Sequence, residues 1–298
     1  MRYPERGDIW RVKFRDRVGS ELRGATNDER PCLIVSRSSF NAGRPRVTIA
    51  PITGYRPLRE DVRSLWGVTI QCNLEVDPDS QIDYPEGEKF LFFQDGRPYR
   101  SIIDCGQLWT IFTPDPDDPE QADLRILIPA RCYDLRWDRR YGKLKERATI
   151  AVDAALQVLV GGGIRYEGNL PFHEGHVLIA KFPGMFGQIH DQRCLVVSST
   201  AVDAIRTRMP RGGNYYNQCT VIPLEPVTEE DKEDDLGIAI VNVYPVGAGS
   251  PIKEVAMCQE LYTLDWSERG AYGPIGRVRN EDMTFVREAL RDYLGLPR

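Results

Sequence analysis

The chain has little histidine and no closely spaced pair of cysteines. Only three of its 298 residues are histidines, His173, His176 and His190, and none lies beside two cysteines. Zinc sites need Cys or His ligands at short spacing, so we expect no metal, and no motif indicates a cofactor. The seven cysteines are odd in number and several stand in apolar runs. This pattern predicts buried thiols in a reducing cytoplasm rather than disulfides.

Long hydrophobic runs are also absent. No apolar stretch reaches the roughly 18 residues that a membrane-spanning helix needs. The first twenty residues carry six Lys and Arg and no apolar segment of the kind that export signals contain. We therefore expect no membrane insertion and no export, and a cytoplasmic protein.

The chain lacks an overall positive charge, since its formal net charge is −5. Residues 1–60, however, hold 13 Lys and Arg against 7 Asp and Glu, a net charge of +6, which leaves −11 for residues 61–298. Because phosphates bind where the field is positive, a polyanion is expected to bind the N-terminal part.

The second half of the sequence repeats the first in five blocks that keep one order. This order predicts a tandem duplication, with one domain at 1–162, a diverged copy at 174–298, and a linker that starts at glycines 161–163 and extends to residue 172. The paired blocks are RGDIWRVKF (6–14) with EGHVLIAKF (174–182), CLIVS (32–36) with CLVVS (194–198), VTIAPI (47–52) with CTVIPL (219–224), CGQLWTI (105–111) with CQELYTL (258–264), and residues 141–161 with residues 275–295.

Each copy reads as several short strands followed by one C-terminal helix. The Val- and Ile-rich strands, separated by Gly, Pro and Asn without helices between them, predict a small, bent antiparallel barrel. Residues 67–76 and 88–94 also have strand character. The helices are expected within 141–161 and 275–295 from their apolar periodicity. Their apolar faces are predicted to comprise Ile150, Val152, Ala155, Leu156 and Leu159 in the first copy, and Met283, Val286, Leu290 and Leu294, flanked by Phe285, Ala289 and Tyr293, in the second.

Three polar residues interrupt the strand pattern of the basic first copy: Glu21, Arg30 and Thr53. Arg30 precedes Pro31, which favours an extended backbone at a strand edge and so presents a guanidinium at the rim of the sheet. A structural alternative is an ion pair of Arg30 with Glu21 or with the acidic residues at 28 and 29.

RGDIWRVKF, then GSE, RPCLIVS, IAPIT and SIIDCGQLWTI, followed by an amphipathic helix, resemble the MazF/PemK/Kid toxins. The resemblance implies a small barrel of the SH3-like or CcdB/PemK-like kind and a homodimer, which one chain with two copies would replace by an intrachain pseudo-dimer. It further implies cleavage of single-stranded RNA without a metal and an antitoxin partner. The family's catalytic Arg and Thr and its assisting Glu correspond to Arg30, Thr53 and Glu21.

These residue types suit attack of an RNA 2′-OH on its own phosphodiester. Glu21 is the candidate base, Arg30 can bind two non-bridging oxygens, and Thr53 can donate a hydrogen bond. The expected products are a 2′,3′-cyclic phosphate and a 5′-OH end. Residues 1–172 contain no histidine, which excludes a two-histidine mechanism there.

Further candidate RNA contacts in the first copy are one aromatic residue and four arginines. The aromatic one, Trp109, stands where the family often has Arg, and it either stacks on a base or belongs to the core. The arginines either line the RNA path or are scattered over a solvated face. They are Arg15, Arg17, Arg23 and Arg37.

The second copy departs from the pattern that carries the chemistry. Gln192 stands at the position of Arg30, Arg193 at that of the proline, and Glu225 at that of Thr53. A carboxylate would repel phosphate, and the GSE loop has no counterpart, so at most one site per chain is expected. His190 is expected to be a surface residue without a role; the alternative is that it substitutes for a group lost from this copy.

Two functions remain open at this point. The leading hypothesis is an endoribonuclease toxin, and the alternative is an inactive relative that binds RNA or a protein partner. The acidic segment 225–235 is expected to be a solvated loop; a weaker hypothesis is that it inhibits the RNA groove of the same chain.

Overall fold

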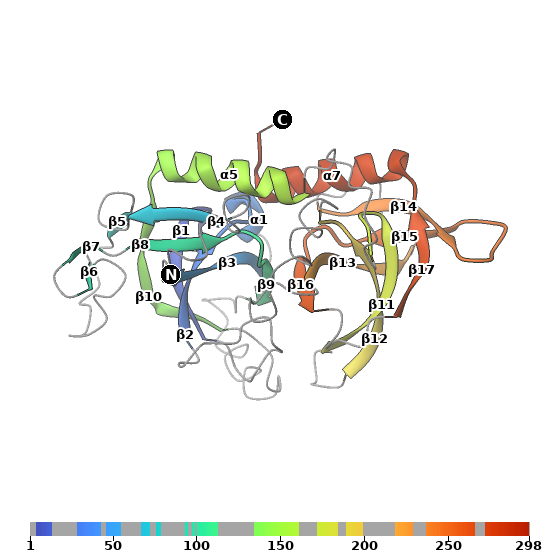
Figure 1. The fold of residues 1–298 in the computed structure, drawn as a ribbon, viewed down its shortest axis with the longest axis horizontal. Helices are drawn as coiled ribbons and strands as arrows, with labels where there is room; N and C mark the ends of the chain where they lie inside the picture. The colour runs from blue at the N-terminus through green and yellow to red at the C-terminus, as the bar shows by residue number, and fades with distance from the viewer. Residues whose placement is uncertain are drawn as a thin grey trace.

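The computed structural model places two small β-barrels side by side, with helices along one side of both (Figure 1). We call residues 4–160 the first half and residues 172–297 the second half. Within them the structure describes residues 4–13, 29–42, 46–54, 67–71, 76–78, 93–94, 97–98, 100–112, 134–160, 172–183, 189–198, 218–228, 237–265 and 272–297.

The second half is a closed barrel of six strands followed by a helix. Its strands hydrogen-bond in the order β12-β11-β17-β14-β15-β13, and β12 also pairs with β13 and closes the ring. The elements are β11 (His176–Pro183), β12 (Ile189–Val196), β13 (Gln218–Pro226), β14 (Ala239–Pro245), β15 (Ile252–Ala256), β16 (Tyr262–Asp265), β17 (Tyr272–Val278) and α7 (Asn280–Leu294).

The first half has the same strand order, with β4 and β5 together in the place of β14. The short helix α1 between β2 and β3 was not predicted, and residues 141–144, expected in the C-terminal helix, instead end β10. The elements are β1 (Asp8–Lys13), β2 (Glu29–Ile34), α1 (Ser38–Asn41), β3 (Arg46–Gly54), β4 (Gly67–Gln71), β5 (Val76–Pro78), the pair β6 (Phe93–Gln94) and β7 (Arg97–Pro98), β8 (Arg100–Asp104), β9 (Trp109–Phe112), β10 (Asp134–Leu144) and α5 (Glu146–Val160).

The register of the strands repeats between the halves as well as their order. Ile9 pairs with Leu33 as Val177 pairs with Leu195. Gly142 pairs with Pro78 in the first half, and Gly276 pairs with Pro245 in the second. The expected fold, mainly β with small barrels and C-terminal helices, is thus confirmed, and equivalent positions of the halves can be compared one by one.

A tight turn opens each barrel, and the two halves build it with different chemistry. Gly7 and Gly175 both have a positive φ, 88° and 86°, which favours glycine. In the first half the Asp8 carboxylate accepts the backbone N–H of Glu5 at 2.9 Å. In the second half Nδ1 of His176 accepts the backbone N–H of His173 at 3.2 Å. The Asp of the RGD motif therefore supports a turn.

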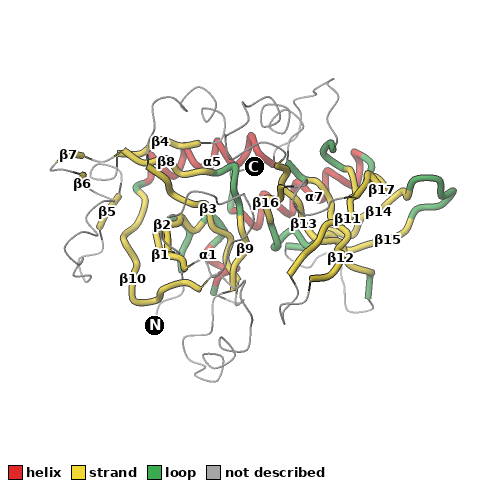
Figure 2. The backbone as a smooth tube through the Cα atoms, turned by 60° about the horizontal axis from the view of Figure 1, so that its bottom comes forward, coloured by secondary structure: helices red, strands yellow, loops and turns green. Residues whose placement is uncertain are grey.

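Helices α5 and α7 lie in one layer over the two barrels (Figures 1 and 2). Most of the predicted apolar faces are buried, but Ile150 and Phe285 are 62% and 59% exposed and so lie off those faces. An ion pair ties each helix to the opening turn of its own barrel, with the charges exchanged between the halves. Arg6 pairs with Asp153 in the first half, and Glu174 pairs with Arg287 in the second.

The buried side chains fall into one large cluster and two smaller ones. The large cluster runs through both barrels and under both helices, from Ile9 to Leu296. Each small cluster lies mainly on the other face of the strands β1, β2, β3 and β9 or of their equivalents. Seven residues of each cluster correspond; Phe172 has no counterpart, and Tyr262, the equivalent of Trp109, packs against both clusters. The first contains Trp10, Val12, Cys32, Ile34, Val47, Ile49, Trp109 and Ile111; the second contains Phe172, Leu178, Ala180, Cys194, Val196, Cys219, Val221 and Leu264.

Candidate active site

The candidate active site lies at one end of β2 and β3 in the first half. These antiparallel strands pair Cys32 with Pro51 and Leu33 with Ala50. Continued by two residues, this register brings position 30 level with position 53. The strands therefore carry Arg30 and Thr53, which are 23 positions apart in the sequence, to the same end of the same strand pair.

Both positions also belong to the same face of the sheet. Side chains alternate between the faces of a strand, and Leu33 and Ala50 belong to the large core cluster, while Cys32 and Ile49 belong to the small one. Position 30 is two residues from Cys32 and position 53 is four residues from Ile49, so both positions fall on the face of the small cluster. They consequently lie at the edge of the face that points away from the barrel interior.

Of the three predicted catalytic residues, Thr53 is described most completely. It lies in β3, is half-buried, and pairs with Ile102 of β8. Arg30 pairs through its backbone with Val12, and its side chain lies outside what the structure describes. Glu21 also lies outside the described residues, as do Arg15, Arg17 and Arg23.

The equivalent end of the second half has different chemistry. The amide Nε2 of Gln192 donates to the carbonyl oxygen of Leu224 at 2.9 Å, and Glu225 is exposed. Arg193 forms an ion pair with Glu254, 2.7 Å from Nη1 to Oε1. Burial raises the pKa of Glu254, although the Arg193 guanidinium opposes that shift. The arginine nearest to this end is thus paired with a buried carboxylate.

Trp109 requires a correction to the base-stacking role considered above. Its side chain is only 2% exposed and belongs to the small cluster of the first half, so it presents no face to a base. It pairs instead with Tyr262, which occupies the equivalent position and contacts both small clusters. The core alternative describes Trp109 correctly.

Arg37 is exposed, and its backbone contacts the second half. Its backbone N–H donates to the carbonyl oxygen of Tyr293 at 2.9 Å, near the end of α7. This contact places the backbone of Arg37 at the junction of the halves. The backbone of His190 lies in β12, and its side chain is outside the described part of the chain.

The two halves contact each other through reciprocal threonines. Oγ1 of Thr110 accepts the N–H of Leu261 at 2.9 Å, and Oγ1 of Thr263 accepts the N–H of Leu108 at 3.0 Å. Each hydroxyl also reaches a carbonyl oxygen of the other half: Thr110 that of Gln259, and Thr263 that of Gly106. Reciprocal contacts of this kind are what a two-fold symmetric dimer would make.

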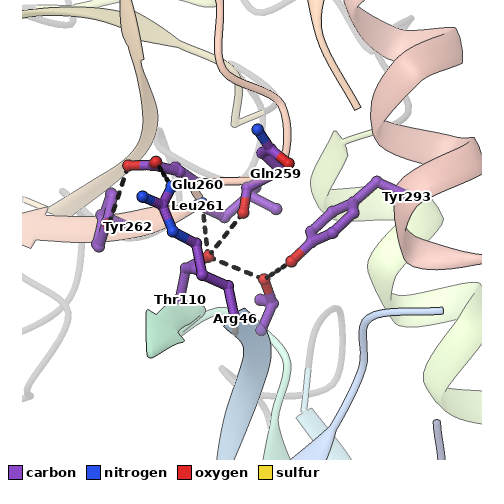
Figure 3. A network of polar contacts seen from close by, with 8 residues as sticks. Arg46, Thr110, Gln259, Glu260, Leu261, Tyr262 and Tyr293 are labelled. Atoms are coloured by element: carbon purple, nitrogen blue, oxygen red, sulfur yellow. Dashed lines mark hydrogen bonds and ion pairs between the residues drawn. The ribbon is translucent and has the colours of Figure 1, made fainter. Parts of the chain in front are cut away.

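The junction also contains two contacts without symmetric equivalents (Figure 3). The hydroxyl of Tyr293 in α7 lies 2.9 Å from that of Thr48 in β3, which is itself 2.9 Å from Oγ1 of Thr110. Burial raises the pKa of Tyr293, so its hydroxyl stays protonated. The other contact is an ion pair between Arg46 and Glu260.

Sequence reasoning missed this polar junction, although the repeated blocks contained its signal. Thr48 and its equivalent Thr220 interrupt apolar strands in the VTIAPI and CTVIPL blocks, and Thr110 and Thr263 interrupt the next pair. All four are buried. Buried hydroxyls at matching positions of both copies indicate a shared hydrogen-bonding role, because a buried polar group needs a partner.

Five of the seven cysteines lie in described segments, and all five are buried and free, as predicted. Among the described residues, no group of three or more His, Cys, Asp or Glu side chains is placed to hold a metal ion. None of the described helices is long and apolar enough to cross a membrane.

A family match covers part of the first half. Residues 5–83 match the family described as PemK-like, MazF-like toxin of type II toxin-antitoxin system. The matched segment contains all three predicted catalytic residues. Comparison with curated proteins gave no match.

Solved structures from Deinococcus radiodurans are similar to part of the chain. Its MazF (form I) is 19% identical with a TM-score of 0.31, over 43% of this chain and 99% of that chain. Its MazE-MazF structure (form II) is 19% identical with a TM-score of 0.30, over 43% of this chain and 100% of that chain.

Proposed function

We propose that the protein is a metal-independent endoribonuclease toxin that cleaves single-stranded RNA at one site in its first half. The observation that carries the proposal is the pairing of Cys32 with Pro51 between β2 and β3. Continued by two residues, this register makes positions 30 and 53 level and puts them on one face. The family match supports it, because it covers Glu21, Arg30 and Thr53 together.

The reaction assigns a separate task to each residue. Glu21 takes the proton of the 2′-OH as the bond from the 2′ oxygen to phosphorus forms and the bond to the 5′ oxygen breaks. Arg30 and Thr53 bind the non-bridging oxygens, where negative charge accumulates in the transition state. The leaving 5′ oxygen takes a proton from solvent, to which Glu21 returns the proton it accepted, and the products are a 2′,3′-cyclic phosphate and a 5′-OH end.

The second half acts in this proposal as the partner subunit of an intrachain pseudo-dimer. We infer that a duplication gave a catalytic domain at 1–162 and a non-catalytic copy at 174–298. The repeated register and the reciprocal threonines support a common origin. Gln192 and Glu225 support the loss of activity, because neither can neutralise a phosphate.

A toxin of this kind needs control by a partner. We infer an antitoxin protein, since the matched family is defined as toxins of type II toxin-antitoxin systems. A soluble RNA substrate further implies action in the cytoplasm.

The proposal is tested with purified protein and long single-stranded RNA in EDTA, with mapping of the cleaved ends. We expect cleavage that leaves 2′,3′-cyclic phosphates, and its loss in Arg30→Ala and Thr53→Ala variants that keep the wild-type circular dichroism spectrum. Cleavage that is unchanged in both variants contradicts the site. RNA binding without cleavage by the wild-type chain supports the alternative, an inactive binding protein.

A further inference from the structure

The outer face of the second barrel carries a row of cationic and aromatic side chains outside the candidate active site. Arg277 of β17 pairs with His176 of β11 on one side and with Tyr244 of β14 on the other. Directly paired residues of antiparallel strands point to the same face. Val278, the next residue of β17, belongs to the core, so Arg277 and its two neighbours face outward.

Two more cations extend this row. Arg279 lies over the Tyr244 ring, with its guanidinium carbon 4.0 Å from the ring centroid. Lys253 of β15 pairs with Asn242, which has the same parity in β14 as Tyr244. We call His176, Tyr244, Lys253, Arg277 and Arg279 the outer row. Its three cations are exposed and form no ion pair in the described part of the chain.

The equivalent face of the first half shows what has changed. Lys143 and Lys145 occupy the positions of Arg277 and Arg279, and both are ion-paired. Lys143 contacts Glu5 at 2.8 Å, and Lys145 contacts Asp77 at 3.5 Å.

In the second half those carboxylates are absent from the equivalent positions. His173 replaces Glu5 and Tyr244 replaces Asp77, while Asp8, which pairs with Lys143, is replaced by His176. The cations are therefore kept and their carboxylate neighbours on the sheet are lost. The nearest acidic residues along the chain, Glu281 and Asp282, begin α7, and Asp282 accepts the N–H of Asn242 at 3.1 Å.

Three exposed cations without ion-pair partners are notable in this half, because residues 172–298 carry 18 Asp and Glu against 13 Lys and Arg. Guanidinium and ammonium groups beside an aromatic ring are the chemistry that binds single-stranded nucleic acid, through its phosphates and its bases. We propose that the outer row is a second binding surface for single-stranded RNA, separate from the cleavage site.

The strands that carry the outer row, β11, β14, β15 and β17, lie on the right in Figure 1. The outer row would raise the affinity for RNA without taking part in the chemistry. The inference rests on the proposed function only in taking RNA as the substrate.

The test measures the affinity of the full chain for a fluorescein-labelled single-stranded RNA of mixed sequence in EDTA, on a Thr53→Ala background that prevents cleavage. If Arg277 and Arg279 each neutralise one phosphate, Arg277→Gln/Arg279→Gln lowers the slope of log affinity against log salt by about 1.4. At about 0.1 M salt this corresponds to about 25-fold weaker binding. Arg277→Lys/Arg279→Lys keeps both charges and most of the affinity.

The matched control is Lys143→Gln/Lys145→Gln, which removes the same charge from the equivalent positions of the first half. We expect a smaller effect, because these lysines are already neutralised by Glu5 and Asp77. Equal effects of the two double variants overturn the inference. So does a second-half variant that loses binding of decaglutamate but not of RNA, since the surface then belongs to an acidic protein.

The outcome is separable from that of the proposed function. If the wild-type chain binds RNA through the outer row but never cleaves it, the proposed activity is contradicted and the proposed binding surface is supported. Cleavage by a chain whose RNA affinity does not depend on Arg277 and Arg279 does the reverse.

Discussion

The two halves share a backbone plan and differ at the end of one strand pair. In the first half this end carries Arg30 and Thr53, and in the second it carries Gln192 and Glu225. The buried framework is kept: Thr110 and Thr263 join the halves, each contacts a threonine of its own half, and most residues of the small clusters correspond. The packing residues therefore match more closely between the halves than the residues of the candidate site do.

The largest effect is expected at Glu21, which has no counterpart in the second half. Glu21→Gln keeps the shape and removes the base, so kcat should fall by about 10² to 10⁴. The fall of activity toward acidic pH should also disappear, since no carboxylate remains to be protonated. The measurement is a pH–rate profile in EDTA. An unchanged profile would show that another group takes the proton.

The shared framework predicts losses of stability that are similar in the two halves. Thr110→Val leaves the N–H of Leu261 without its acceptor, and Thr263→Val does the same to Leu108. Each change should lower the free energy of unfolding by about 1–3 kcal/mol. Thr110→Val should be the more costly, because its contact with Thr48, at 2.9 Å, is shorter than that of Thr263 with Thr220, at 3.4 Å.

Urea unfolding measures both variants. Thr284→Val serves as the control, because its hydroxyl bonds a carbonyl on an exposed helix turn and its loss should have little effect. If only one of the two variants, Thr110→Val or Thr263→Val, lowers the free energy of unfolding, the two symmetric contacts do not contribute equally to stability.

Tyr293 sharpens the comparison because its equivalent in α5, Leu159, has no hydroxyl. Tyr293→Phe should lower the free energy of unfolding by about 1 kcal/mol. The effect is smaller than that of Thr110→Val, since Thr48 keeps its contact with Thr110. Urea unfolding of the variant beside the wild type gives the difference. An unchanged free energy of unfolding would mean that the contact between the hydroxyls of Tyr293 and Thr48 does not stabilise the fold.

The smallest expected effect is a pH dependence of stability that comes from one carboxyl group of the second half. Glu254, whose equivalent in the first half is Ser101, has a pKa raised by burial. The folded state thus binds this proton more tightly than the unfolded chain does. Stability is highest below the ordinary pKa and falls as the pH rises through the raised one.

The expected fall is below about 1 kcal/mol, because the Arg193 guanidinium opposes the effect of burial on the pKa of Glu254. Unfolding at about pH 4 and about pH 7 should show it in the wild type and not in Glu254→Gln. A wild type whose stability rises over that range relative to the variant would reverse the assigned sign.

Much of the fold could be predicted because its signals are local. Alternating strands, the apolar periodicity of two helices and the order of five blocks predicted the barrels and their helices. Residues 141–144 show the limit: the apolar pattern continues into them, but pairing with β5 makes them strand. Such a pairing depends on a distant segment and cannot be read from the local sequence.

The candidate site was predicted from residue types, and its geometry was not. Nothing in the sequence states that positions 30 and 53 are level, because that follows from the pairing of β2 with β3. The burial of Trp109 likewise depends on its pairing with Tyr262 of the other half. The outer row became visible only when strand register placed Arg277 between His176 and Tyr244.

The most direct test compares matched variants of the two halves in one RNA cleavage assay in EDTA. The pairs are Arg30→Ala with Gln192→Ala, and Thr53→Ala with Glu225→Ala. We predict that each first-half variant loses about 10²-fold or more in kcat/KM, while its second-half counterpart stays near wild type. Equal losses in the two halves, or a loss only in the second, would contradict the assignment of one working site to the first half.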